Sequence, residues 1–577
     1  MCFSTNLRYL GKYRPYGKPW SFRPQQFSKS GARQQDFLRR TILKGLHNTL
    51  PEETVSNIRD GYYRSPTDPQ SAEDDFKKTD QPYHPIKRDR HYRKALRVVE
   101  KMFRPTRRLK PIHFADLRAY PWTLNTSAEW PYRGDKRWED HVKQKYREGE
   151  VDSIHLNFHN LYDEIFDANR WNIHLIKDGK APFWKDGEPV PYGFTFLHSR
   201  SHLRRIDQDP KIRAVFGVPK LLLMAENMFI WNLQREYQNR PLHTGPLLWG
   251  YETFRAGWNK LASRLSRHPI KSIISTDWSG FDHKALHELI DDIHEMWRNW
   301  FDFDQGYEPS ENDDHSYKYS KTDPLRLQNL WDWMTNAIKK TPIIAESGNM
   351  YEWNFNGIAS GFQQTQLLDS FVNAVMILTC LSAAGINIES EHFQALFQGD
   401  DSIIAFPEIV DFLPFLRRVS DEAKLRFNAD ISPDKTTHGE WFDGIEVLSY
   451  TYQGGLARRD PDEVLAHLLY PERLRNDEET AAACCGLASA LMGCSLPHYL
   501  ALKDIFVFLV DVLKIQPRLP KAEEKIFELI ALPKLTDFPT FEETFLQNLD
   551  IRGRTEAQRQ QLWPTKPRGE KNFHFLE

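Results

Sequence analysis

KSIISTDWSGFD (271–282) and FQALFQGDDSIIAF (393–406) are the two stretches that decide the fold. In the first, a short apolar run with strand character stops at Asp277, and apolar residues recur at helical spacing after Phe281. In the second, two apolar runs are joined by residues 398–401, whose glycine and aspartates are typical of a hairpin turn. Each pattern is common by itself, because such residues often serve only to start a turn.

The acids at these strand ends have the chemistry of a metal site. Asp277 closes the first strand, and Asp400 and Asp401 form the tip of the hairpin. Carboxylates brought together from adjacent strand ends are oxygen ligands of the kind that Mg²⁺ prefers. Two such ions about 3.5–4 Å apart can activate a 3′-hydroxyl and stabilise a leaving pyrophosphate. Asp282 lies past the turn, so we expect it to hydrogen-bond a sugar hydroxyl rather than reach the metals.

SGFQQTQLLDSFVN (360–373) predicts a glycine loop followed by a helix. Three polar residues of this helix are four apart: Thr365, Asp369 and Asn373. Residues at that spacing project from one helix face, so these three could contact a ribose while the opposite face packs. Gly361, beside Ser360, supplies a loop whose backbone can approach a nucleic-acid strand closely.

In this order, the motifs resemble those of viral RNA-dependent RNA polymerases, with the greatest likeness to the partitivirus group of bisegmented double-stranded RNA viruses. The resemblance implies that DWSGFD (277–282) is the first palm motif, with Asp277 a metal ligand and Asp282 a ribose contact. The segment 360–373 is similar to the second motif. GDDS (399–402) is similar to the third, with Asp400 the second metal ligand and Asp401 an auxiliary one.

Three flanking segments extend the resemblance. KIRAVFGVPK (211–220) resembles the basic fingers motif that neutralises the incoming triphosphate, SPDKTTHG (432–439) the motif with a proton-donating lysine, and EVLSYTYQGGLARR (446–459) the motif that grips the growing strand. The six matches cover about two fifths of the chain. They assign Lys211 and Arg213, with Arg204 as an extra contact, to the triphosphate, and Lys435 to proton donation; for Lys435 a surface position after a turn is the alternative.

The second motif departs from that of many positive-strand virus polymerases, which have Asn where this chain has Asp369. Partitivirus-like enzymes resemble this chain at that position. Two acids, Asp282 and Asp369, would then lie near one ribose. A shared proton, or an intervening Thr365 or Asn373, would relieve their repulsion.

The resemblance also implies a fold, a cofactor and partners. The fold class is α/β (α+β), a right-handed polymerase with an antiparallel palm sheet and largely helical fingers and thumb. The expected divisions are a basic N-terminal extension bridging fingers and thumb (1–102), fingers (103–270), palm (271–300), a fingers insertion (301–357), palm (358–454), and thumb with the C-terminal region (455–577). Two Mg²⁺ ions, replaceable by Mn²⁺, would serve as cofactor. The partners would be an RNA template and product strand, nucleoside triphosphates and a viral capsid protein, without a membrane, in the host cytoplasm inside the virion.

Composition and charge fit a large globular protein that meets a polyanion. The chain has 577 residues, 40% of them hydrophobic, and a formal net charge of -2. Residues 1–110 hold 25 Lys and Arg against 11 Asp and Glu. This basic part either contacts a polyanion or pairs with acids inside the fold. For the basic run 87–110 the two interpretations are a contact with backbone phosphates and a solvated helix face. Residues 1–82, with little periodicity, are expected to be extended or loosely structured.

The remaining patterns concern compartment and elements. Five cysteines without zinc-ligand spacing, and an N-terminus without the apolar core of a signal peptide, favour a reducing compartment. Two uncharged stretches, 370–388 and 480–502, contain enough polar residues and Gly or Pro to favour buried helices over membrane spans. We further expect a surface insertion at 302–323, a helix at 331–340, a strand at 447–452, and mostly helix from 461 to about 532.

Three other classes of protein are weighed against the polymerase. A reverse transcriptase has the same arrangement of metal-binding acids in its palm. However, Asp282 stands where such enzymes tend to place a bulky side chain that excludes the 2′-hydroxyl, and the hairpin tip lacks their Tyr-x-Asp-Asp. A non-enzymatic RNA-binding or capsid-associated protein explains the basic N-terminus but not the acids at strand ends. A glycosidase using paired carboxylates gives no reason for Lys211 and Arg213.

Overall fold

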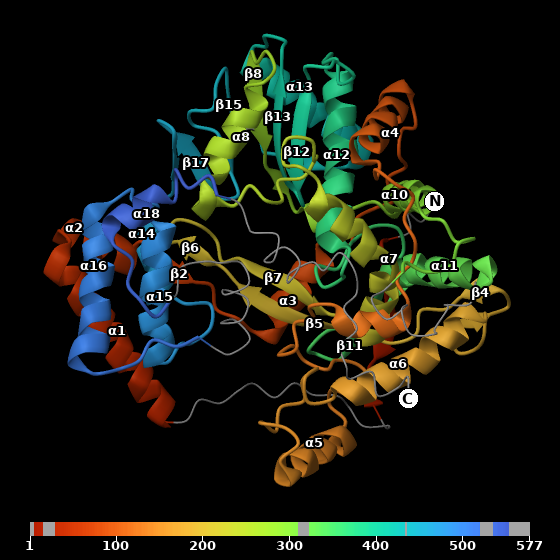
Figure 1. The fold of residues 1–577 in the computed structure, drawn as a ribbon, viewed down its shortest axis with the longest axis horizontal. Helices are drawn as coiled ribbons and strands as arrows, with labels where there is room; N and C mark the ends of the chain where they lie inside the picture. Colours follow the sequence, from red (N-terminus) through yellow and green to blue (C-terminus); the bar gives the residue numbers. More distant parts are fainter. Residues whose placement is uncertain (1–4, 16–28, 310–321, 433–434, 520–534, 553–577) are drawn as a thin grey trace.

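A four-stranded antiparallel sheet lies in the upper part of the view in Figure 1; the computed structural model describes residues 5–15, 29–309, 322–432, 435–519 and 535–552. Its strands, in spatial order, are β12 (Gln394–Gln398), β13 (Asp401–Phe406), β8 (Ser272–Thr276) and β15 (Thr437–Gly439). The hairpin expected from the sequence is confirmed, because β12 pairs with β13 in antiparallel register. β8 then pairs with β13, and all five residues of β8 are buried.

Four helices cover this sheet and one another. They are α4 (Arg90–Phe103), α10 (His287–Trp300), α12 (Thr365–Ala383) and α13 (Phe412–Phe427). α12 contacts the other three helices and β12. Within the described ranges it is the one helix long and apolar enough to cross a membrane, and 89% of its most apolar window is buried inside the protein. The helices expected after 281 and from about 363 are therefore present, and the second is a core element.

A second sheet of five strands lies below the first in the view of Figure 1. Its order is β1 (Leu7–Lys12), β11 (Asn349–Trp353), β10 (Ile343–Ile344), β5 (Thr195–Ser201) and β7 (Ile212–Gly217). Helices α6 (Tyr162–Lys177), α7 (Lys220–Asn239) and α11 (Pro324–Lys340) pack together beside it. The expected helix at 331–340 is confirmed and begins seven residues earlier than predicted. Of the expected insertion at 302–323, residues 310–321 lie outside the described residues.

The N-terminal region is not loosely structured, so that expectation is wrong for its described residues. It forms β1, α1 (Lys29–Thr49), α2 (Glu52–Asp60), β2 (Tyr62–Arg64) and α3 (Pro69–Lys77). α1 buries Leu38, Ile42 and Leu46, which recur every four residues on one face, and the buried Leu50 directly follows the helix. This apolar period was not recognised in the sequence because many polar residues lie between its members. The helix is stable because its apolar face packs against distant parts of the chain.

Those distant parts are the C-terminal helices. They are α14 (Pro461–Leu469), α15 (Asp477–Ala490) and α16 (Leu496–Val507), followed by one π-helical turn (Phe508–Val512). α1 packs on α16 and α2 on α14, and their apolar side chains form one core (Figure 1, red helices among blue). The helical prediction after 461 is confirmed to 512, while residues 520–534 lie outside the described residues.

The strand expected at 447–452 is present in two parts, divided by a turn at Leu448 and Ser449. β16 (Glu446–Val447) and β17 (Tyr450–Gln453) pair antiparallel, and β18 (Leu456–Arg458) follows. Leu448 and Ser449 have φ angles of 52° and 66°, a left-handed conformation that no glycine announces in the sequence.

Much of the basic run 87–110 pairs with acids inside the fold. Arg88 contacts Asp292 at 2.5 Å, Lys94 contacts Glu389 at 3.2 Å, and Arg107 contacts Glu308 at 2.9 Å. These ion pairs favour the interpretation that this run is a solvated and internally paired surface of α4 and its flanks.

The remaining described elements complete a mixed α/β fold of the expected class. They are α5 (Lys136–Glu148), β3 (Trp184–Lys185), β4 (Glu188–Pro189), β6 (Leu203–Arg205), α8 (Gly257–Leu265), β9 (Trp278–Ser279), α9 (Phe281–Lys284), β14 (Asp430–Ile431) and α18 (Phe541–Leu546), with 3₁₀ turns at Phe114–Ala119 and Thr253–Arg255.

One buried acid joins α7 to the start of α12. Glu226 is fully buried; its Oε1 accepts a hydrogen bond from Gln364 Nε2 at 2.8 Å, and its Oε2 accepts one from the backbone N–H of Gln363 at 3.2 Å. His294 in turn contacts Gln364 Oε1 at 2.7 Å. Burial raises the pKa of Glu226 to about 8, since the hydrogen bonds to the carboxylate offset only part of the desolvation.

We predict that the stability of the protein falls as pH rises from about 4.5, the ordinary pKa of this carboxyl, to about 8. In that window the folded state holds a proton that the unfolded state has lost, so each pH unit removes up to about 1.4 kcal/mol. Glu226→Gln should remove this contribution. The melting temperature of the variant minus that of wild type should therefore increase as the pH is raised from 6 to 8.5. The exposed Glu139→Gln on α5 is the control. A constant difference across that range would contradict the prediction.

Candidate active site

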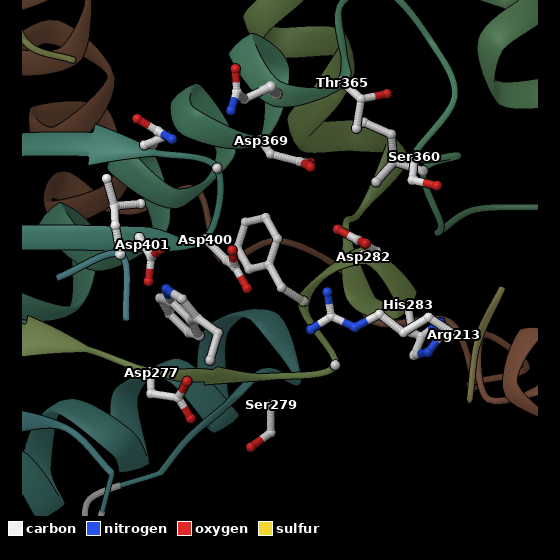
Figure 2. A pocket seen from close by; sticks show the side chains of 18 of the residues that line it. Arg213, Asp277, Ser279, Asp282, His283, Ser360, Thr365, Asp369, Asp400 and Asp401 are labelled. Carbon is white, nitrogen blue, oxygen red and sulfur yellow. The ribbon is translucent and has the colours of Figure 1, made fainter. Parts of the chain in front are cut away.

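A cavity of about 1290 Å³ lies between the two sheets, and most of the residues singled out from the sequence line it. The lining includes Arg204, Lys211, Arg213, Asp277, Asp282, Ser360, Thr365, Asp369, Asp400, Asp401 and Lys435. Gly361 and Asn373 lie just behind that lining. Segments from distant parts of the sequence therefore border one space, as Figure 2 shows for ten of its residues.

Strand pairing brings the three acids of the strand ends together. Ser402 pairs with Thr276 in the β13–β8 ladder, so Asp401 and Asp277 occupy the next positions along neighbouring strands. Partial desolvation raises the pKa of Asp277, and the charge of Asp400 raises it further. Burial and the charges of Asp400 and Asp277 raise the pKa of Asp401 to about 7. The acids thus repel one another at the cavity wall.

A basic group faces these acids. Lys211 and Arg213 are exposed residues at the start of β7, and Arg204 lies on the neighbouring β6. Partial desolvation in the cavity lowers the pKa of Lys211, and so do the charges of Arg213, Arg204 and Lys435. Lys435 lines the same cavity as the acids, and its charge lowers the pKa of Asp277. Clustered cations in a cavity attract a polyanion such as a triphosphate.

A second pair of acids lies deeper in the cavity. Asp369 on α12 is buried, and Asp282 beyond the first motif's turn lies beside it, with their carboxylates directed toward each other (Figure 2). Burial raises the pKa of both residues, and the charge of Asp400 adds to it in each. These directions favour a proton shared between Asp282 and Asp369, one of the two solutions open from the sequence.

The other polar residues of α12 hold the site's backbone in this structure. Asn373 is fully buried; its Nδ2 donates to the carbonyl oxygens of Gly399 and Asp400 at 3.0 and 2.9 Å, and its Oδ1 accepts from Trp278 Nε1 at 2.9 Å. Thr365 Oγ1 donates to the carbonyl of Ala359 at 2.6 Å. A ribose contact by either side chain stays a prediction.

Two contacts behind the hairpin were not predicted from the sequence. Ser370 Oγ accepts a hydrogen bond from the backbone N–H of Gly399 at 2.9 Å. Trp278 is buried, and its Nε1 donates to Asn373, the residue that also binds this turn. The spacing of Ser370 and Asn373 in the second motif was the available signal, since residues three apart share a helix face.

The glycine of the loop before α12 is required by close packing. A Cβ at Gly361 would lie 2.0 Å from the backbone oxygen of Phe216, at the end of β7. This contact locks the Ser360–Gly361 loop against the strand that carries Lys211 and Arg213. Ser360 is exposed to the cavity.

The donor set suits a hard divalent cation. Within the described ranges, no three His, Cys, Asp or Glu side chains are grouped so that they could hold a metal ion as they stand. The carboxylates of Asp277, Asp400 and Asp401 nevertheless border one cavity and repel one another, as the raised pKa values of Asp277 and Asp401 show. A divalent cation among them would offset that repulsion, and oxygen ligands of this kind match Mg²⁺ chemistry.

Comparison with known proteins agrees with this geometry. The family model described as viral RNA-dependent RNA polymerase matches residues 47–491. The RNA-directed RNA polymerase of White clover cryptic virus 1 (isolate Boccardo/2004) is 29% identical over 609 aligned positions, covering 97% of this chain and 96% of the relative. The RNA-directed RNA polymerase of Atkinsonella hypoxylon virus (isolate 2H) is 25% identical over 453 positions, covering 71% and 65%.

The chain belongs to the viral RNA-dependent RNA polymerase family, because that model matches well over half of its length. It is an RNA-directed RNA polymerase, and RNA and nucleotides are its substrates. The family in general uses divalent metal ions. The sequence-based expectation of a partitivirus-like polymerase is confirmed, and the reverse transcriptase, the non-enzymatic RNA-binding protein and the glycosidase are set aside.

We predict that Gly361→Ala lowers nucleotide incorporation at least about tenfold, because the added methyl group displaces the loop from Phe216 by more than the packed interior tolerates. Gly245→Ala is the matched control, since its Cβ would meet nothing closer than 3.9 Å. Initial rates on an RNA template measure both. Equal activity of the two variants would contradict the importance of this contact.

Proposed function

We propose that the chain adds nucleoside triphosphates to an RNA 3′-hydroxyl under the direction of an RNA template, using two metal ions. The observation that carries the proposal is the meeting of acids and cations across one cavity. Asp277 and Asp401 occupy neighbouring positions on paired strands, and Lys211 and Arg213 border the same space. Such a pairing of charges suits a reaction whose catalysis consists mainly of positioning and electrostatic stabilisation.

The acids would hold the metal ions. Asp277 and Asp400 would each contribute carboxylate oxygens to two Mg²⁺ ions, for which Mn²⁺ could substitute, and Asp401 would be auxiliary. When bound, the ions would supply Lewis-acid activation of the 3′-hydroxyl and stabilisation of the leaving pyrophosphate. The raised pKa values of Asp277 and Asp401 support this assignment, because burial and the charges of neighbouring acids raise both of them.

The basic side chains would bind the triphosphate and assist the departure of pyrophosphate. The 3′-hydroxyl loses its proton to water, its oxygen attacks the α-phosphorus, and the bond from that phosphorus to the pyrophosphate oxygen breaks. Lys211, Arg213 and Arg204 would neutralise the negative charge of the triphosphate. Lys435 would donate its ammonium proton to the departing pyrophosphate, and its position beside Asp277 supports this role.

Sugar choice would lie with the deeper acids. Asp282 would hydrogen-bond the ribose 2′-hydroxyl, which can both donate and accept. Asp369 would hold the proton that lets the two carboxyl groups lie side by side. Thr365 or Asn373 would also hydrogen-bond the ribose, in place of one of the hydrogen bonds that each makes within the protein. Ser360 and Gly361 would let the backbone of the loop approach the RNA strand closely.

The elements would divide as in a right-handed polymerase. The four-stranded sheet with α10, α12 and α13 would be the palm (271–300 and 358–454), and the five-stranded sheet with α6, α7 and α11 the fingers (103–270 and 301–357). α14 to α16 would be the thumb (455–577). Residues 1–102 would bridge fingers and thumb; β1 pairs with β11, while α1 packs on α16, which supports that role.

The biological setting is also part of the proposal. We propose replication and transcription of a double-stranded RNA genome, in the host cytoplasm and inside a virion, with the capsid protein as partner. Cys380, Cys484, Cys485 and Cys494 form no disulfide among the described residues, which supports a reducing compartment.

We predict that Asp277→Asn and Asp400→Asn each lower incorporation by about a hundredfold or more while leaving RNA binding largely intact, because the amide cannot serve as an anionic metal ligand. The control is Asp140→Asn, an exposed position on α5. Incorporation of labelled nucleotides and a filter-binding assay measure the two properties. Near-normal activity of either variant would mean that the metal site is misassigned.

We predict that Asp282→Ala narrows the preference for GTP over dGTP beyond any general loss of rate. Losing a partner of the 2′-hydroxyl removes about 1–3 kcal/mol of discrimination, or roughly ten- to a hundredfold. Ser279→Ala, at an exposed cavity residue with no assigned sugar contact, should keep the wild-type ratio. The measurement is the ratio of incorporation efficiencies for GTP and dGTP on one RNA template. An unchanged ratio in Asp282→Ala would contradict a contact between Asp282 and the ribose.

A further inference from the structure

The strand that carries the basic group is an edge strand covered by the N-terminal region. β7 is the last strand of the five-stranded sheet and pairs only with β5 there. An edge strand leaves backbone N–H groups without partners in the sheet. Two N-terminal side chains satisfy such groups at the functional end of β7: Ser65 Oγ accepts from Lys211 N–H at 2.9 Å, and Asp75 Oδ2 accepts from Ala214 N–H at 2.9 Å.

Asp75 has further partners on its other side. It lies on α3, is 8% exposed, and its Oδ1 accepts from Lys78 Nζ at 2.9 Å. The same oxygen lies 3.5 Å from His283 Nε2. Burial alone would raise the pKa of Asp75, but hydrogen bonds from His283, Ala214 and Lys78 outweigh it and hold that pKa well below its ordinary value. The group is therefore a buried, charged acceptor with three different partners.

The geometry of β7 connects this acceptor to the substrate side. Because successive side chains of a strand point to opposite faces, Lys211 and Arg213 project together, away from Phe216. Phe216 contacts the ring of Phe76, the residue after Asp75, with ring centroids 6.1 Å apart. α3 thus packs on the back of β7 while Asp75 fixes its edge.

His283 connects the same acceptor to the other wall of the cavity. It directly follows Asp282, and both residues, with Asp75 and Lys78, line the cavity. Asp75 therefore joins two segments that come from different parts of the chain: the strand with Arg213, and the turn with Asp282 and His283.

We propose that Asp75, on the N-terminal helix α3, is a positioning residue for nucleotide binding that sets the distance between Lys211 and Arg213 on one wall and Asp282 on the other. This inference rests on the proposed function, since it takes these residues to be the triphosphate and ribose contacts. Asp75 acts through the Ala214 N–H and through His283, and its proposed role is not a contact with the reacting atoms.

The test compares Asp75→Ala and Asp75→Asn with Asp74→Asn, a neighbouring exposed acid on the same helix. The alanine removes both connections. The asparagine keeps an oxygen that can accept from Ala214 N–H but loses the charge that His283 and Lys78 meet. Single-nucleotide incorporation on a primed RNA template gives KM for GTP and kcat separately, and the melting temperature reports stability.

We expect Asp75→Ala to raise KM for GTP roughly tenfold, which corresponds to about 1.4 kcal/mol, with kcat within about threefold of wild type. Asp75→Asn should recover part of the loss, and Asp74→Asn should match wild type. If Asp75→Ala does not fold, the rise of KM in Asp75→Asn over Asp74→Asn carries the test.

Unchanged KM in both Asp75 variants would overturn the inference, as would a fall in kcat and melting temperature at constant KM, which is the signature of a purely structural role. Failure of the wild-type chain to incorporate nucleotides would instead overturn the proposed function on which the inference rests.

Discussion

The pairing of β13 with β8 is the constraint on which the rest of the site depends. It fixes three carboxylates at adjacent strand ends, where they desolvate and repel one another, so the pKa values of Asp277 and Asp401 are raised. The repulsion among these carboxylates is unfavourable for the folded protein by itself, and cations near them offset it. The surrounding structure supplies them from β6 and β7 as Arg204, Lys211 and Arg213, across the same cavity. Bound metal ions and substrate would complete the balance of charge.

A gathering of like charges needs a rigid support, and the buried helix α12 provides it. Asn373 and Ser370 bind the backbone of the acidic hairpin from behind, while Gln364 at the helix start is held by the buried Glu226. The loop before the helix is fixed by contact between Gly361 and Phe216. One helix therefore sets both the acids and the loop, which explains why its own polar residues are engaged with the protein in this structure.

Local patterns in the sequence were enough for the centre of this site and not for its surroundings. The strand before Asp277, the acidic hairpin and the helix with Asp369 each follow from periodicity and turn residues, and their order led to the family. Neither the packing of α1 on α16 nor the contact of Asp75 with Ala214 leaves a local signal, because the partners lie more than a hundred residues away. The turn at Leu448 was also hidden, since its left-handed backbone is stabilised by pairing of its flanking strands rather than by a glycine.

The most direct test of the metal site is incorporation of labelled nucleoside triphosphates by the purified wild-type chain on an RNA template, with Mg²⁺ added or removed by a chelator. We expect RNA product that depends on both the template and the divalent ion, and that returns when Mg²⁺ or Mn²⁺ is restored. Template-directed synthesis that persists without any divalent ion would contradict the assignment of the strand-end acids as a metal site.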